Sequence, residues 1–371
     1  MLTRIARRLS DAQYQRKRRT FFRRSFDPHA SRRLLLLAVN HRIPQSQLFP
    51  FHYYADAFRT DLDVDIREIP VDEYLNAKHL NGATTVCFQT HFDISDDALL
   101  HLVAELRRRN PGARLVYLDW FAPTDLRLAE RIGPLVDAYV SKHLLRDMGQ
   151  YGQPTFGDTT LMDYYGRVHN LMHDMKTFPV STEFKEKLYL GPSFVTADFM
   201  LPVFDRGIAP SGPRPIELHA RIAVEGTPWY RAMRQGCADA VAGLRDVECV
   251  TGFGIRHDLF LRELRRSKIC FSPFGYGEVC WRDYEAIMCG AVLLKQDTSH
   301  VATAPDIFEA FETYVPVKWD LSDLPQQVAW LLRDKAARTR IAGAAFDRLH
   351  SYARTRAFVG QMAPALFPDA P

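Results

Sequence analysis

The residues best placed to do chemistry lie in one stretch of the chain, Ser267 to His300. An apolar, strand-like run ends there in a loop that contains Gly275 and Gly277, and a helical pattern follows from about Trp281. Glycines let a ligand approach backbone N–H groups, and the first turn of a helix offers unpaired N–H donors that suit a phosphate. The pattern therefore predicts an anion site at the start of this helix.

Two charged side chains on the same helix extend this prediction. Arg282, in the first turn, can grip a diphosphate with two parallel hydrogen bonds. Glu285 follows three residues later on the same face, where its carboxylate can accept two hydrogen bonds from a ribose diol. Taken singly, the pair is equally compatible with an exposed ion pair, and the glycines with a tight turn. Taken together, these residues favour a nucleotide site.

The segment 285–290, with the sequence EAIMCG before an apolar strand, resembles the donor-binding motif of GT-B glycosyltransferases. In that superfamily the glutamate holds the ribose of the nucleotide. The arginine ahead of it is similar to that of exostosin-like and related bacterial polysaccharide glycosyltransferases, where it faces the diphosphate. The loop 270–278 also resembles bacterial group 1-like enzymes, but Gly277 stands where their first glutamate lies. The role of the neighbouring Glu278, and a retaining outcome, do not carry over.

The resemblance implies an α/β protein with two Rossmann-like domains and a cleft between them. We expect a basic N-terminal arm (1–33), an acceptor domain (34–185), a nucleotide-sugar-binding domain (186–352) and a C-terminal helix that returns to the first domain (353–371). The implied activity is hexosyl transfer from a nucleotide-sugar to a saccharide or lipid-linked acceptor in surface polysaccharide synthesis.

Alternating strand and helix patterns support this architecture. In the first half, strands are expected at 34–39, 64–69, 84–89, 115–118 and 138–141, and helices at 48–58, 96–109 and 125–131. In the second half, strands are expected at 216–224, 247–251, 269–272, 291–294 and 313–317, and helices at 229–242, 258–266, 281–289, 324–332, 339–352 and 355–367. Residues 150–215, rich in Pro, Gly and aromatics, are expected to form an irregular linker.

The donor and acceptor sides are predicted on loops at strand ends. The expected donor-binding residues are Arg221, Gly254, Arg256, Ser272, Gly275, Tyr276, Gly277, Glu278, Arg282, Glu285 and Lys295. The expected catalytic residues, on loops of the first domain, are His91, Asp93 and Asp119, because an inverting enzyme needs a base near the acceptor hydroxyl. Each of these three residues is also compatible with a structural role, as a charged loop residue or a helix cap. The aromatic residues Trp120, Phe121, Phe51 and Tyr53 fit either a sugar platform or the core.

Charge is distributed unevenly along the chain. The net charge is +4, but residues 1–33 hold eleven Arg or Lys against two Asp, which leaves the remainder mildly acidic. This basic arm fits a solvated tail, a contact with anionic lipid headgroups or a nucleic-acid contact. We expect a peripheral contact with anionic membrane and no nucleic acid among the partners.

Other features bear on location and cofactors. The chain shows no signal peptide, and its six cysteines form no CxxC pair, which indicates a reducing cytoplasm. The basic arm extends this expectation to a peripheral place at the inner membrane face. No metal site is expected, since Arg282 and the helix dipole can neutralise the leaving diphosphate. No cofactor is expected beyond the nucleotide-sugar substrate. A nucleotide-sugar epimerase, a non-catalytic sugar-nucleotide-binding partner and a two-lobed small-ligand binding protein remain as alternatives.

Overall fold

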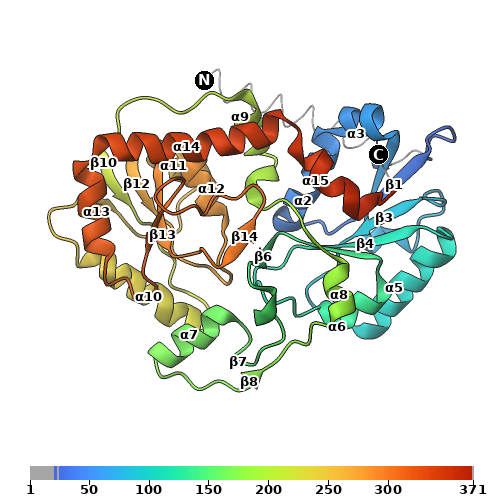
Figure 1. The fold of residues 1–371 in the computed structure, drawn as a ribbon, viewed down its shortest axis with the longest axis horizontal. Helices are drawn as coiled ribbons and strands as arrows, with labels where there is room; N and C mark the ends of the chain where they lie inside the picture. The colour runs from blue at the N-terminus through green and yellow to red at the C-terminus, as the bar shows by residue number, and fades with distance from the viewer. Residues whose placement is uncertain (1–20, 23–24, 370–371) are drawn as a thin grey trace.

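Two parallel β-sheets, each covered by helices, form the two lobes of the protein (Figure 1). The computed structural model describes residues 21–22 and 25–369. The sheet of the first lobe has the order β2-β1-β3-β4-β5-β9, and all neighbouring strands in it are parallel. Its strands are β1 (Arg32–Ala38), β2 (Val64–Pro70), β3 (Thr85–Phe88), β4 (Arg114–Asp119), β5 (Ala138–Ser141) and β9 (Leu188–Leu190). The sheet thus continues past the domain boundary expected at residue 185.

The helices of the first lobe follow the predicted order, with an additional short helix, α4, and a helix α6 that is shorter than expected. They are α2 (Arg42–Tyr53), α3 (Ala55–Leu62), α4 (Val71–Tyr74), α5 (Asp96–Arg109) and α6 (Ala129–Ile132). Ser95 caps α5 as predicted, since its hydroxyl accepts a hydrogen bond from the Ala98 N–H at 3.3 Å. The helix expected at 48–58 is two helices that meet at Tyr54, whose hydroxyl donates to the Ala353 carbonyl at 2.7 Å.

The second lobe has a five-stranded parallel sheet of order β11-β10-β12-β13-β15. Its strands are β10 (Ile216–His219), β11 (Cys249–Val250), β12 (Ser267–Phe271), β13 (Val292–Gln296) and β15 (Val315–Val317). The helices are α10 (Pro228–Ala242), α11 (His257–Arg265), α12 (Trp281–Met288), α13 (Leu324–Arg333) and α14 (Lys335–Arg354). The prediction of two Rossmann-like domains is confirmed.

In both sheets, the second strand lies on one side of the first strand and the following strands lie on the other side. In the second lobe, β10 has β11 on one side and β12 on the other, and in the first lobe β1 lies between β2 and β3. Ligands of open α/β sheets bind outside the carboxyl ends of the strands at such a switch point. The order therefore places the sites at the ends of β10 and β12, and of β1 and β3.

Residues 150–215 are more ordered than an irregular linker. They contain α7 (Thr160–Val168), α8 (Thr182–Glu186), β9 and α9 (Leu201–Arg206). Although α7 lies in the chain between strands β5 and β9 of the first lobe, its residues Leu161 and Tyr165 pack with Trp229, Met233 and Phe274 of the second. The expectation of irregular packing was wrong for this helix, because its apolar face is buried against the other lobe.

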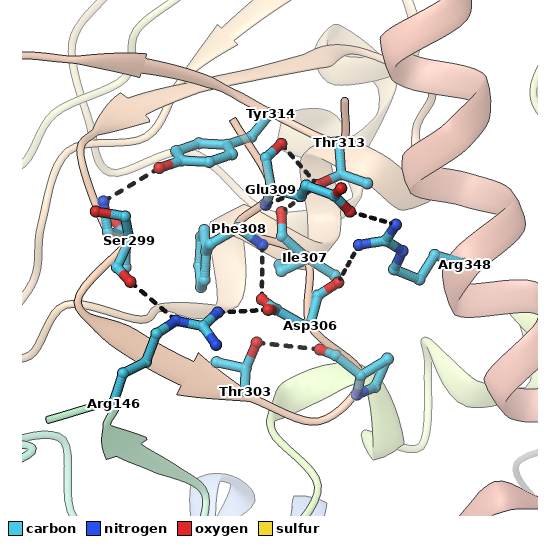
Figure 2. Close-up of polar contacts among 12 residues, drawn as sticks. Arg146, Ser299, Thr303, Asp306, Ile307, Phe308, Glu309, Thr313, Tyr314 and Arg348 are labelled. Atoms are coloured by element: carbon cyan, nitrogen blue, oxygen red, sulfur yellow. Dashed lines mark hydrogen bonds and ion pairs between the residues drawn. The ribbon is translucent and has the colours of Figure 1, made fainter. Parts of the chain in front are cut away.

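A short antiparallel ladder also joins the lobes. Strand β6 (His143–Leu145) pairs with β14 (Val301–Thr303). Directly after β6, Arg146 donates to the Ser299 carbonyl at 2.9 Å and pairs with Asp306 (Figure 2). On the other side of the same loop, Arg348 of α14 donates to the Asp306 carbonyl at 2.9 Å and to Glu309 at 2.6 Å. The loop that follows β14 is therefore held from both lobes.

The helix α15 (Ala357–Leu366) returns to the first lobe after α14 has passed along the second (Figure 1). The Leu366 carbonyl accepts a hydrogen bond from Thr85 at 3.1 Å, and the Ala365 carbonyl accepts one from Arg114 at 2.7 Å. Among the described residues, no helix has both the length and the apolar character needed to cross a bilayer. The predicted membrane contact of the basic arm falls mostly on residues 1–20 and 23–24, outside the described part of the chain.

Candidate donor site

The first turn of α12 is fixed at the carboxyl end of β12 before any ligand binds. The Asp283 carboxylate accepts hydrogen bonds from the Cys280 N–H at 2.9 Å and from the Ser272 hydroxyl at 2.6 Å. Lys295 Nζ lies 3.2 Å from the same carboxylate, and both of these side chains are fully buried. The helix start that carries Arg282 is therefore locked in place by its neighbours.

Arg282 is a half-buried cation in which two of the three guanidinium nitrogens lack an acceptor among the described residues. Its Nε and Nη1 are buried without a hydrogen-bond partner in the described part of the chain, and its guanidinium lies 5.7 Å from the centre of the Phe260 ring. Burial, and after it the charge of Arg282, lowers the pKa of His219 at the end of β10 to about 4. Each buried donor left unpaired costs on the order of 1–3 kcal/mol. An anion at this position would remove that cost.

Glu285 lies beside a histidine from the neighbouring helix. Its Oε1 is 2.6 Å from Nε2 of His257, the first residue of α11. The Glu285 side chain is 8 % exposed and that of His257 is 33 % exposed, so the pair can still be reached from solvent. Because a carboxylate has about four acceptor positions, Glu285 can bind His257 and a diol together. The sequence pattern alone gave no reason to place His257 beside Glu285.

The first lobe supplies a cation to the same neighbourhood. Phe199 stacks on Trp281 with ring centres 5.2 Å apart, and its ring lies 5.2 Å from that of His257. The guanidinium of Arg42 lies 4.7 Å from the centre of the Phe199 ring and 5.0 Å from that of Trp281. Arg42 begins α2 at the end of β1. Sequence reasoning gave Arg42 no role, although its place after the first strand is a switch-point position.

Three predicted donor-binding residues have structural partners instead. Lys295 is buried against Asp283, and Ser272 donates to the same carboxylate. Arg221 makes two hydrogen bonds to Glu263, at 2.6 and 2.8 Å, and a third to the Thr251 carbonyl. These contacts use the donors that a phosphate would need, so the structure argues against Lys295, Ser272 and Arg221 as ligand contacts.

The remaining predicted donor residues lie on two loops. Gly254 and Arg256 are exposed beyond β11, where Arg256 pairs with Asp258. Gly275 and Tyr276 lie on the loop after β12, and the Tyr276 ring stacks on Tyr230 with centres 4.4 Å apart. These four residues lie near the strand ends. The structure shows no hydrogen bond, ion pair or ring contact between them and Arg282 or Glu285.

Gly277 and Glu278 meet the first lobe. A Cβ at Gly277 would lie 1.9 Å from the Ala122 carbonyl oxygen, so glycine is required by the lobe contact. Glu278 is 2 % exposed and accepts a hydrogen bond from the Thr124 hydroxyl at 2.6 Å. Its other oxygen lies 3.7 Å from His300. Both residues therefore hold the lobes together, and Glu278 is buried in that contact, away from the solvent side from which a nucleotide-sugar would enter.

Acid should weaken the protein through two buried histidines. Burial, and then the nearby Lys142, lowers the pKa of His143 beside Glu278, and His219 is lowered to about 4. In the unfolded chain, both histidine rings bind protons below the ordinary histidine pKa of about 6.5. In the folded protein, they bind protons only near pH 4. The contribution of these two histidines to the free energy of unfolding is therefore fully present above about pH 6.5 and is lost as the pH falls towards 4.

We expect the unfolding midpoint temperature to drop across that window, and His143→Gln to flatten part of the drop. Glutamine can still donate to the Ala122 carbonyl, which His143 Nε2 contacts at 3.0 Å. The measurement is thermal unfolding between pH 4 and 7, with the exposed His79→Gln as control. An identical pH profile for wild type and His143→Gln would contradict the assignment.

The predicted catalytic residues have three different environments. His91 lies at the end of β3, 46 % exposed, and its Nε2 is 2.9 Å from Asp72. Asp93 is exposed on the same loop. Asp119 is buried and accepts hydrogen bonds from Tyr139 at 2.7 Å and from the Phe121 N–H at 2.9 Å. Burial raises the pKa of Asp119. Asp119 is thus occupied by structural partners, whereas His91 is reachable and is oriented by Asp72, which sequence reasoning did not single out.

The aromatic residues predicted as a sugar platform are mostly core. Phe51 is fully buried, and Phe121 is buried. Tyr53 donates to Asp205 at 2.6 Å, and Trp120 donates to the Thr90 carbonyl at 2.9 Å. The exposed Phe92, whose ring lies 5.2 Å from that of Phe121, is the aromatic residue that these loops present to solvent.

A cavity lies at the opposite end of the strands of the second sheet. It has a volume of about 550 Å³ and lies between residues 209–214 and α14. Arg214 on its wall donates to the Ser267 and Cys289 carbonyls at 2.8 Å each. The cavity is therefore at the amino ends of the strands, away from the switch point. The hydrogen bonds of Arg214 there are already made to backbone carbonyls. Within the described residues, no group of three or more His, Cys, Asp or Glu side chains could hold a metal ion.

No protein-family model and no curated protein sequence matches the chain. Solved structures do. An alpha-glucosyltransferase in complex with UDP and a 13-mer DNA containing a HMU base is 11% identical, with a TM-score of 0.52 over 91% of this chain and 99% of that one. A glycosyltransferase from Rickettsia africae is 9% identical, with a TM-score of 0.51 over 91% and 99%. At such identities the likeness concerns the fold alone.

The fold is GT-B. The predicted resemblance is thereby confirmed at the level of architecture: two Rossmann-like lobes, with a C-terminal helix that returns to the first. In a GT-B fold the carboxyl ends of both sheets face the space between the lobes, and Arg282, Glu285 and Arg42 all lie at those ends.

One expectation about partners is overturned. The sequence analysis excluded nucleic acid, but this GT-B fold is shared with alpha-glucosyltransferase bound to UDP and HMU-containing DNA, and to UDP-glucose and DNA containing an abasic site. The second of these has a TM-score of 0.51 at 10% identity, over 89% of this chain and 99% of that one. The exclusion was wrong because it rested on charge and composition, which do not restrict the acceptor of this fold.

Proposed function

We propose that the protein is a glycosyltransferase that moves a sugar from a nucleoside-diphosphate sugar to a hydroxyl group of a saccharide or lipid-linked acceptor. The observation that carries the proposal is Arg282, a half-buried guanidinium with two buried nitrogens that lack an acceptor among the described residues, at the start of α12. A preformed cation of this kind stabilises charge that develops on a leaving diphosphate. The GT-B fold that the chain shares with glycosyltransferases supports the proposal.

The reaction would divide between the lobes. The bond between the anomeric carbon and the phosphate oxygen breaks, and the diphosphate leaves towards Arg282 and the N–H groups of α12, while Glu285 holds the ribose. The acceptor hydroxyl then bonds to the anomeric carbon. In an inverting course, His91 takes the hydroxyl proton and Asp72 orients its ring at 2.9 Å. In a retaining course, the departing phosphate takes that proton.

The proposed reaction needs no metal, because Arg282 and the helix dipole supply the positive charge. We also propose surface polysaccharide synthesis in the cytoplasm as the setting. The six cysteines are unpaired, in keeping with a reducing compartment. The epimerase alternative uses the same donor grip but needs no acceptor, and the non-catalytic alternative binds the donor without changing it.

Thermal shift with UDP, GDP, CMP and dTDP compounds tests donor binding. We expect one nucleotide family to raise the midpoint temperature of the wild type. Glu285→Gln should weaken that binding about 10- to 100-fold, because the neutral amide loses charge-assisted hydrogen bonds to the ribose worth about 1.5–3 kcal/mol. The exposed Glu312→Gln is the control. Equal affinity in Glu285→Gln and the wild type would move the ribose site elsewhere.

Activity assays then separate the candidate functions. The selected donor is incubated with no acceptor, an oligosaccharide, a lipid-linked saccharide or duplex DNA. Transfer to either saccharide supports the proposal. Transfer to DNA alone would contradict the proposed acceptor class, and release of an altered donor sugar without an acceptor would favour the epimerase.

A further inference from the structure

Arg234, on α10, is a buried arginine for which the proposed donor grip gives no role. It is 6 % exposed. Its Nε donates to the Ala223 carbonyl at 3.0 Å, and its Nη1 donates to the carbonyls of Pro273 and Phe274 at 3.2 and 2.9 Å. A guanidinium that binds three backbone carbonyls fixes the path of the chain at each of them.

These carbonyls belong to the two loops that follow β10 and β12. Ala223 lies on the first loop, and Pro273 and Phe274 lie on the second. The two strands are neighbours at the switch point of the second sheet. Arg234 therefore ties together the two loops between which a ligand of such a sheet binds. Among the buried residues of α10, Arg234 is the one whose side chain makes hydrogen bonds to both loops.

The charge around Arg234 is not balanced. Neither Arg234 nor Arg282 forms an ion pair within the described residues, whereas nearby Glu263 is bound by Arg221 and Asp283 by Lys295. Burial, and then the charge of Arg282, lowers the pKa of Arg234. Arg234 is buried and Arg282 is half-buried, and positive charges withdrawn from water without an opposite charge destabilise a folded protein unless an anion joins them.

We infer that Arg234 is a positioning residue of the donor site, which fixes both strand-end loops and provides, beside Arg282, the second positive charge for the ligand's phosphates. The inference rests on the proposed function for the identity of the ligand. The second amino group of Arg234, Nη2, makes none of the hydrogen bonds found among the described residues, so it remains available to a phosphate oxygen. Lysine would keep the charge but lose the three-carbonyl grip.

The test compares Arg234→Lys and Arg234→Met with the wild type. The matched control is Arg231→Lys, an exposed arginine one turn earlier on α10 that contacts one carbonyl at 3.4 Å. Calorimetric titrations use the nucleoside, its monophosphate and its diphosphate, in the base that the thermal panel selects, and inorganic pyrophosphate. Unfolding curves of the unliganded variants report whether each one folds.

We expect Arg234→Lys to lower diphosphate affinity about 10- to 100-fold, with the nucleoside affinity changed less than threefold and Arg231→Lys like the wild type. In transfer assays kcat should fall more than KM rises, because a loosened loop misplaces the reacting phosphate. If Arg234→Met does not fold, Arg234→Lys and the wild-type pyrophosphate titration still decide the question.

Three outcomes would overturn the inference. Unchanged diphosphate affinity in Arg234→Lys removes the role of Arg234 in binding. An equal loss for nucleoside and diphosphate indicates a merely structural side chain. Absence of pyrophosphate binding by a folded wild type removes the anion site. If the wild type binds pyrophosphate in an Arg234-dependent way but binds no nucleotide, the proposed function fails while the anion site stands.

Discussion

Arg282→Met should abolish donor binding and leave the unliganded protein at least as stable as the wild type. The two effects share one cause. The Arg282 guanidinium has two buried nitrogens, Nε and Nη1, without acceptors among the described residues, so the unliganded fold bears a desolvation cost that a methionine of similar length does not. The diphosphate loses its charge-assisted hydrogen bonds, and kcat/KM should fall about 100- to 1,000-fold.

The measurement combines thermal unfolding without ligand, titration with the selected diphosphate, and initial rates. Arg282→Lys is the informative comparison, because it retains one charge without the planar fork and should retain part of the binding. The control Arg340→Met, at an exposed arginine paired with Glu312, should change none of the three quantities. Near-normal rates in Arg282→Met would place the chemistry elsewhere on the protein and contradict the proposed function.

Gly277→Ala should separate the lobes or unfold the protein. The added Cβ would lie 1.9 Å from the Ala122 carbonyl oxygen and 2.6 Å from its carbon, and neither is a flexible side chain that can rotate away. Relief requires a shift of backbone, which would also stretch the 2.6 Å hydrogen bond from Thr124 to Glu278. Overpacking of this kind costs about 1–3 kcal/mol or more.

Gly275→Ala is the matched control on the same loop. Its added Cβ would lie 3.7 Å from the Gly277 carbonyl oxygen, which is an ordinary contact. We expect the Gly277 variant to lose several degrees in unfolding midpoint and to show a larger radius of gyration in solution scattering, with the Gly275 variant close to the wild type. Equal behaviour of the two variants would show that the lobes do not need this contact.

The order of strands and helices could be predicted from the sequence because its causes are local. The run 34–37 is wholly apolar because β1 is buried on both faces, and Ser95 has the side chain that a helix start requires. The spacing of Arg282 and Glu285 is also local, since one helix presents both. These features need no knowledge of which other segments lie nearby.

The remainder of the candidate site depends on contacts between distant segments. Lys295 ends a strand, as a phosphate-binding lysine would, but Asp283 from another element occupies it. Glu278 sits in a ligand-like loop, but Thr124, far away in the chain, takes its carboxylate. His257 reaches Glu285 only because α11 and α12 pack side by side. Such pairings are set by the tertiary fold, so composition and periodicity do not indicate them.

The position of α15 has a consequence for biosynthesis. Phe358 on this helix lies 4.9 Å, ring centre to ring centre, from Phe51, and Met362 and Leu366 join the same buried cluster as Leu34 and Val116. The ribosome makes this stretch after the entire second lobe. A nascent first lobe must therefore wait with an uncovered apolar surface while most of the polypeptide is still being synthesised, a period in which unfinished chains are prone to aggregate.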